Sequence, residues 1–106
     1  MKLTKHKVKE LKKKFPGRIP CVVLKNKKSR LDNLRKNKFL VPEDITLGQF
    51  IFIIRKNLTI KSSKALFLFC NKKIIPNTLL MSQIFKEQKN KNNYLEFEYM
   101  EENVFG

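Results

Sequence analysis

The segment that most constrains the fold lies near the end of the chain, where residues 95–99 alternate between apolar and acidic side chains. On a strand, Leu95, Phe97 and Tyr99 would point to one face, and Glu96 and Glu98 to the other. This alternation is typical of a sheet that is covered on one face and solvated on the other. The chain therefore needs a sheet, and an apolar element to cover it.

A suitable helix comes earlier in the chain. Thr46 is followed three residues later by Gln49, which predicts a capping box at a helix start, and the helix is expected to reach about Asn57. Its predicted core stripe consists of Leu47, Ile51, Ile54 and Leu58. Phe50 and Ile53 are assigned to an adjoining face, so the apolar arc is wider than one core requires.

Three further apolar runs predict strands, at residues 19–25, 38–41 and 65–70. The third run is apolar on both faces and is expected to be central. Pro20, which has no amide donor, fits the start or the edge of a strand. Residues 25–38 show no apolar period and predict a solvated loop.

Two shorter helices are also expected. Val8, Leu11 and Phe15 recur at offsets of three and four, which predicts an amphipathic helix that Pro16 and Gly17 end. Thr78 is expected to cap a second short helix that carries Leu80, Met81, Ile84 and Phe85.

Together these elements predict an α+β fold of the β-grasp type, with a mixed four-stranded sheet around one main helix and one N-terminal helix before the first strand. A length of 106 residues favours a single domain. Its expected parts are the N-terminal helix (1–16), the β-grasp core (17–100) and a flexible tail (101–106).

The formal charge of +15 predicts acidic partners, such as nucleic acid, an anionic membrane or acidic peptides. No apolar run approaches the ~18 residues of a membrane span, and the basic start lacks the hydrophobic region of a signal peptide. We therefore expect the chain to begin as a soluble cytoplasmic protein.

The residues needed for catalysis or cofactor binding do not form a recognisable set. His6 lies among lysines, Cys21 and Cys70 lie inside apolar runs that favour core packing, and three glycines supply no phosphate-binding loop. We predict no enzyme activity, no cofactor and no metal site.

Six segments carry a resemblance to a known family: KFPGRIP, KSR, KFLVPEDITLGQF, IIRK, ALFLF and the closing NVFG. In this order and spacing the chain resembles the autophagy-related protein 8 family, the GABARAP-like ubiquitin-like modifiers. The resemblance covers nearly the whole chain. It implies a ubiquitin fold and a protein that is conjugated to other molecules rather than an enzyme.

In this family a C-terminal glycine, here Gly106, is activated by an E1-like enzyme, passed to an E2-like enzyme and joined to phosphatidylethanolamine. A dedicated cysteine protease processes and deconjugates family members. The resemblance thus implies a cytoplasmic protein that attaches reversibly to autophagosomal or related membranes. A glycine has no side chain to obstruct a narrow thioester channel.

The resemblance also implies that receptors with aromatic-x-x-aliphatic motifs add a strand to residues 38–41. The implied aromatic pocket consists of Leu11, Pro20, Lys38, Leu40 and Tyr94. The implied aliphatic pocket consists of Phe39, Val41, Pro42, Ile45, Phe50 and Ile53. Contacts to acidic residues of the ligand are implied for Arg18, Lys36 and Lys38.

Three features depart from most of the family: the short N-terminus, Asn57 in place of a basic residue, and the strongly cationic surface. The charge favours a different function, that of a basic nucleic-acid-binding domain, although no specific nucleic acid is expected. A modifier that is attached to proteins rather than to lipid, and a diverged scaffold that is not conjugated, also fit the sequence.

Overall fold

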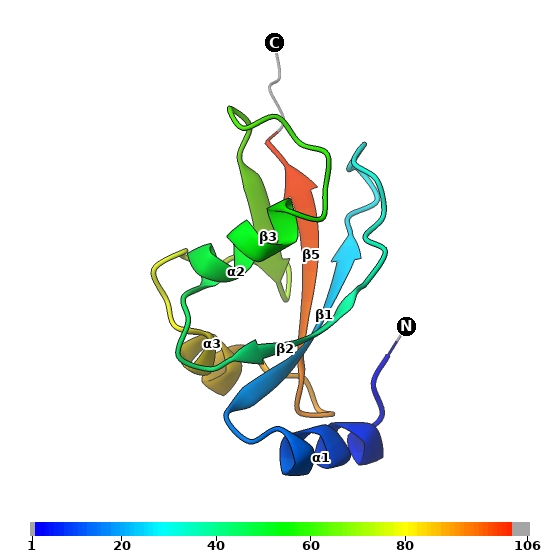
Figure 1. Cartoon of the computed structure of the whole chain (residues 1–106), viewed down its shortest axis with the longest axis vertical. Helices are drawn as coiled ribbons and strands as arrows, with labels where there is room; N and C mark the ends of the chain where they lie inside the picture. Colours follow the sequence, from blue (N-terminus) through cyan, green and yellow to red (C-terminus); the bar gives the residue numbers. More distant parts are fainter. Residues whose placement is uncertain (1, 103–106) are drawn as a thin grey trace.

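The computed structural model describes residues 2–102. Its helices are α1 (Lys5–Lys14), α2 (Leu47–Arg55) and α3 (Met81–Gln88). Its strands are β1 (Arg18–Lys25), β2 (Lys38–Pro42), β3 (Leu66–Cys70), β4 (Lys73–Ile74) and β5 (Leu95–Glu101). The strands form one mixed sheet in the order β2-β1-β5-β3-β4, in which only β1 and β5 are parallel (Figure 1).

The predicted α+β class and β-grasp arrangement are confirmed, but the sheet has five strands instead of four. The additional strand is β4, which pairs with the end of β3. Asn71 and Lys72 adopt positive φ angles of 53° and 65° between these strands. Two consecutive residues of this kind match the twist of a tight hairpin. The chain therefore reverses directly after β3, and β4 pairs with it antiparallel.

The main core lies between the sheet and α2. The alternation in β5 is confirmed, because Leu95, Phe97 and Tyr99 are buried while Glu96 and Glu98 are exposed. The capping box is also confirmed: the Gln49 amide donates to Thr46 Oγ1 at 3.2 Å, and the Thr46 amide donates to Gln49 Oε1 at 2.9 Å. The helix ends slightly earlier than expected, at Arg55.

The assignment of Phe50 to a surplus face of α2 is wrong. Phe50 is 0 % exposed, and its ring contacts Phe39 edge-on at 5.5 Å and Phe97 at 6.0 Å between centroids. The reason is helical spacing, since Phe50 stands three residues after Leu47 and four before Ile54, on the same stripe. The exposed apolar side chains of α2 are instead Phe52 and Ile53.

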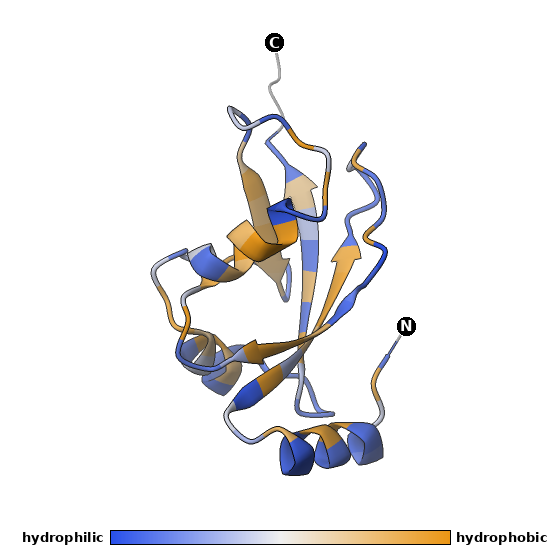
Figure 2. Cartoon of the chain, viewed as in Figure 1, coloured by the Kyte–Doolittle hydropathy of each residue, from blue (hydrophilic) through white to orange (hydrophobic). Residues whose placement is uncertain are grey.

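The opposite face of β1 carries α1 and a second, smaller core. Leu3, Val8, Val22 and Tyr94 form this cluster, with Leu24 packed against it. Successive residues of β1 alternate between the two cores, because Cys21 and Val23 belong to the main cluster. Figure 2 shows the contrast between the mostly hydrophilic α1 and the apolar α2.

The N-terminal helix is shorter than the predicted 1–16. It begins at Lys5 because Thr4 is its N-cap, where Thr4 Oγ1 accepts from the Lys7 amide at 3.1 Å. Gly17 follows the helix with φ +81°, a conformation that glycine adopts without strain, and leads directly into β1.

The loop between β1 and β2 is better anchored than its polar sequence suggests. Leu34 is buried in the main core, Ser29 Oγ donates to Glu101 Oε1 at 2.7 Å, and the Arg30 amide donates to Glu101 Oε2 at 3.0 Å. The strand β5 thus continues through Glu101, so the expected tail boundary at residue 101 is too early. Gly106, the predicted conjugation residue, lies outside the described residues.

Two further expectations need correction. The outer face of β3 is not covered, since Phe67 is 36 % exposed, although β3 does lie inside the sheet. The second short helix begins at Met81 rather than near Thr78, because Gln83 Oε1 accepts from the Leu80 amide at 2.8 Å and fixes the helix start there. No helix within residues 2–102 has the length and apolar character to cross a membrane.

Candidate functional site: a pocket beside a free strand edge

The strand β2 is an edge of the sheet, and its outer side pairs with no strand among residues 2–102. Hydrogen bonds from the Val23 amide to the Asn37 carbonyl and from the Glu43 amide to the Gly17 carbonyl fix which residues face β1. By the alternation of an antiparallel ladder, the amides of Phe39 and Val41 face β1. The amides and carbonyls of Lys38 and Leu40 therefore face outward.

Pro20 fits this pattern although β1 is an interior strand. Pro20 is opposite Leu40 in the register, at a pair that exchanges no hydrogen bonds. On the other side of β1, the pairing with β5 begins only at Cys21. Pro20 lies near the start of β1, as the sequence predicts, and its missing donor falls where neither neighbouring strand needs one.

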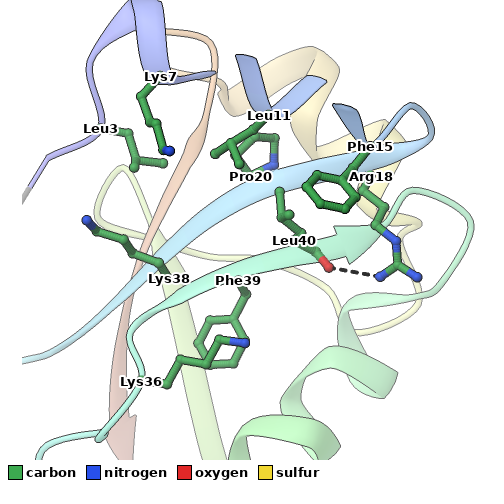
Figure 3. Close-up of a pocket in the computed structure, with 10 residues that line it drawn as sticks. All are labelled: Leu3, Lys7, Leu11, Phe15, Arg18, Pro20, Lys36, Lys38, Phe39 and Leu40. Atoms are coloured by element: carbon green, nitrogen blue, oxygen red, sulfur yellow. Dashed lines mark hydrogen bonds between the residues drawn. The ribbon is translucent and has the colours of Figure 1, made fainter. Parts of the chain in front are cut away.

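A pocket of about 540 Å³ lies between α1 and this edge (Figure 3). Its apolar lining consists of Leu3, Leu11, Phe15, Pro20, Phe39 and Leu40. Its polar lining consists of Lys7, Arg18, Lys36 and Lys38. The site therefore combines an apolar floor, a cationic rim and unpaired backbone groups on an adjoining strand.

The structure brings together four of the five residues of the implied aromatic pocket: Leu11, Pro20, Lys38 and Leu40. The fifth, Tyr94, is 1 % exposed and lies in the small core against Leu3 and Val22. Tyr94 therefore supports the pocket from beneath α1 and offers no free surface to a ligand.

The three predicted contacts for acidic residues, Arg18, Lys36 and Lys38, all line the same pocket. Arg18 Nη1 donates to the Leu40 carbonyl at 3.2 Å, so the guanidinium occupies one of the outward acceptors of β2. Lys36 Nζ stands 5.7 Å from the centroid of the Phe39 ring. Within residues 2–102 the one contact of salt-bridge distance joins His6 Nε2 to Glu10 Oε1 at 3.4 Å, so none of the rim cations is paired with a carboxylate there.

The residues of the implied aliphatic pocket differ in exposure. Phe50 and Val41 are buried in the main core, while Phe39, Pro42 and Ile45 are half-buried and Ile53 is 41 % exposed. The edge-on packing of Phe39 against Phe50 closes this side of β2. Four of the six, Phe39, Val41, Ile45 and Phe50, belong to the main core or pack against it.

Three lining residues were not predicted: Leu3, Lys7 and Phe15. Phe15 belongs to the amphipathic stripe of α1, and Lys7 stands four residues before Leu11 on the same side of the helix. This spacing identifies Lys7 as a neighbour of the pocket once Leu11 is placed there. Leu3 precedes the helix, where no periodicity applies.

Both cysteines pack in the core as predicted, at 0 % and 1 % exposure for Cys21 and Cys70. Burial raises the pKa of the Cys70 thiol to about 11 and that of Cys21 well above its usual value. The two thiols are therefore protonated and unreactive at neutral pH. Residues 2–102 contain no group of three or more His, Cys, Asp or Glu side chains placed to hold a metal ion.

The mixed sheet in the order β2-β1-β5-β3-β4, packed against α2, defines the class of this protein, a ubiquitin-like β-grasp domain with an additional N-terminal helix. The family model described as "Autophagy protein Atg8 ubiquitin like" matches residues 4–106. The chain belongs to this family of ubiquitin-like autophagy proteins.

Individual relatives agree with this assignment. The chain is 40 % identical to Autophagy-related protein 8e of Arabidopsis thaliana, covering 91 % of this chain and 79 % of that protein. It is 42 % identical to Autophagy-related protein 8 of Candida glabrata, covering 91 % and 81 %. The crystal structure of Trypanosoma brucei ATG8 superposes with a TM-score of 0.89 at 30 % identity, covering 96 % of this chain and 88 % of that one.

Proposed function

We propose that this chain is a ubiquitin-like modifier that is joined through Gly106 to phosphatidylethanolamine and then docks receptors on autophagosomal or related membranes. Residues 1–106 act as one ubiquitin-like domain. An E1-like and an E2-like enzyme conjugate it, a cysteine protease releases it, and the chain itself catalyses no reaction.

The observation that carries the docking half of the proposal is the pocket between α1 and the free edge of β2. An extended peptide has backbone groups that complement the outward amides and carbonyls of Lys38 and Leu40. An aromatic side chain from such a peptide would enter the apolar floor beside Leu11. The cations at Lys36 and Lys38 would meet acidic neighbours, where each rim pair contributes about 0.5 kcal/mol.

The lipid half rests on family membership and on a glycine at the end of the matched region. Membrane attachment follows energetically from the lipid, because each buried methylene contributes ~0.8 kcal/mol and phosphatidylethanolamine supplies two acyl chains. The charge of +15 adds attraction to anionic membranes.

The conjugation test is reconstitution with the family's E1-like and E2-like enzymes, ATP and liposomes that contain phosphatidylethanolamine. We expect lipid-linked product from the intact chain and none from a chain that lacks Gly106. Formation of an adduct without Gly106, or no thioester from the intact chain with active enzymes, would refute the lipid half. An adduct on protein lysines instead of lipid would show that the chain modifies proteins.

The docking test is titration of an aromatic-x-x-aliphatic peptide into the purified chain by calorimetry. We expect saturable one-to-one binding that Leu40→Ala weakens. The control is an RNA oligomer at low and moderate salt: binding that falls steeply with salt, without any peptide binding, would favour a nucleic-acid-binding domain.

A further inference from the structure

The polar side chains that line the pocket share one chemical property. Lys7, Arg18, Lys36 and Lys38 are all hydrogen-bond donors, and none of them carries an acceptor. The remaining lining side chains are apolar. A ligand group that enters this pocket therefore meets side chains that donate, and the outward Leu40 carbonyl already accepts from Arg18.

Lys7 has a special place among these cations. It lies one helical turn before Leu11 and lines the pocket from α1, with its side chain pointing from the helix toward β1 (Figure 3). Lys38 comes from the other wall, in β2, while Lys36 lies beside the Phe39 ring on the α2 side of that strand (Figure 3). A ring that enters between α1 and β2 would thus have cations on both sides of its outer end.

This arrangement discriminates between aromatic side chains. A tryptophan brings an indole N–H, which is a donor only and would lose its water without gaining a side-chain acceptor. A tyrosine oxygen accepts a hydrogen bond from an ammonium group. A phosphorylated tyrosine adds up to two negative charges and strong acceptor oxygens, and hydrogen bonds between ionised partners are about twice as strong as neutral ones.

We propose, resting on the docking function above, that this pocket selects an aromatic residue with an anionic acceptor at its tip, namely phosphotyrosine, and that Lys7 is the specificity-determining residue. The order of affinity at the aromatic position is phosphotyrosine, then tyrosine, then tryptophan. The apolar floor of Leu11, Pro20 and Leu40 contacts the ring, and the ammonium groups bind the phosphate.

The test uses four peptides that differ only at or beside the aromatic position: tyrosine, phosphotyrosine, tryptophan, and tyrosine preceded by phosphoserine. Each is titrated by fluorescence anisotropy into the wild-type chain, Lys7→Glu and the charge-matched control Lys13→Glu, an exposed α1 residue outside this pocket. We expect the wild type to bind phosphotyrosine about tenfold or more tighter than tryptophan. Lys7→Glu should abolish that preference, and Lys13→Glu should keep most of it.

Three results would overturn the proposal. They are a wild type that binds tryptophan as tightly as phosphotyrosine, equal losses in Lys7→Glu and Lys13→Glu, and a gain from phosphoserine that equals the gain from phosphotyrosine. In each of these cases peptides still bind, so the docking function survives and only the selectivity fails. If no peptide binds, the docking function fails and the selectivity fails with it.

Discussion

On the α2 face of β1, Ile19, Cys21 and Val23 are at most 4 % exposed, whereas on the α1 face a pocket of about 540 Å³ reaches the edge strand β2. The first face is filled by aromatic contacts between Phe39, Phe50 and Phe97. The second is covered by a short helix that leaves Leu11 and Leu40 half-buried. The α2 face of β1 therefore stabilises the fold, whereas the α1 face leaves side chains accessible to a ligand.

The variant Phe50→Ala should show most clearly that the α2 face stabilises the fold and does not bind the ligand. Removing a ring that is 0 % exposed should lower the free energy of unfolding by about 3 to 5 kcal/mol, measured by urea denaturation. The control Ile53→Ala, at 41 % exposure on the same helix, should cost less than about 1 kcal/mol. A stable Phe50→Ala that loses only peptide binding would instead place Phe50 in an open pocket.

Leu40→Ala should show the opposite behaviour, because Leu40 lines the pocket and is only half-buried. We expect peptide affinity to fall by about 2 kcal/mol, roughly thirtyfold, while unfolding changes by less. Calorimetric titration and urea denaturation measure the two quantities. The matched control is Leu80→Ala, an exposed leucine outside the pocket, which should leave affinity unchanged.

The buried thiols report on opening of the α2 face. Burial raises the pKa of Cys70 to about 11, so alkylation at pH 8 should proceed only through opened molecules. Ile54→Val, expected to cost about 1 kcal/mol, should speed labelling about fivefold. Leu80→Val is the control without effect. Rapid stoichiometric labelling of the wild type would show that this face is open.

The smallest expected effect concerns the loop that carries Lys36 to the pocket. Burial tends to raise the pKa of Glu101, but hydrogen bonds from Ser29 and Arg30, together with nearby Lys64, leave it lowered. A lowered carboxyl pKa adds stability above the unfolded value of ~4.3 and loses it as pH falls through the folded pKa. Glu101→Gln should therefore be less stable than wild type at neutral pH and equal to it in acid.

Urea denaturation between neutral and acidic pH measures this difference. Glu96→Gln, an exposed carboxylate on the same strand, serves as the control and should show no such loss. A Glu101→Gln variant that matches wild type at every pH would show that the hydrogen bonds to the loop do not stabilise the fold.

Most of the fold could be predicted from the sequence because local patterns and tertiary packing agree. The alternation in β5 predicts a strand covered on one face, and the capping box at Thr46 predicts a helix start. Strand β4 could not be predicted, since it consists of two residues and depends on a turn at Asn71. The prediction for Phe50 is wrong because Leu47 and Ile54 are joined at offsets of three and four through Phe50 as well as through Ile51, and both rows are buried.

The site was predicted in part for a physical reason. Side chains at strand and helix positions, such as Pro20, Leu40 and Leu11, follow from periodicity together with the family resemblance. Whether a residue lines the pocket or lies beneath it depends on the packing of segments that are distant in the sequence. Tyr94 packs in one cluster with Leu3, which is 91 residues away in sequence, and no local pattern predicts that contact.

The most direct test of the central claim is amide hydrogen exchange with and without a saturating aromatic-x-x-aliphatic peptide. The outward amides of Lys38 and Leu40 should become protected, while those of Phe39 and Val41, already bonded to β1, should change little. Protection that instead appears at Leu66 and Leu68, whose amides face away from β5, with Lys38 and Leu40 unchanged, would contradict docking at the β2 edge.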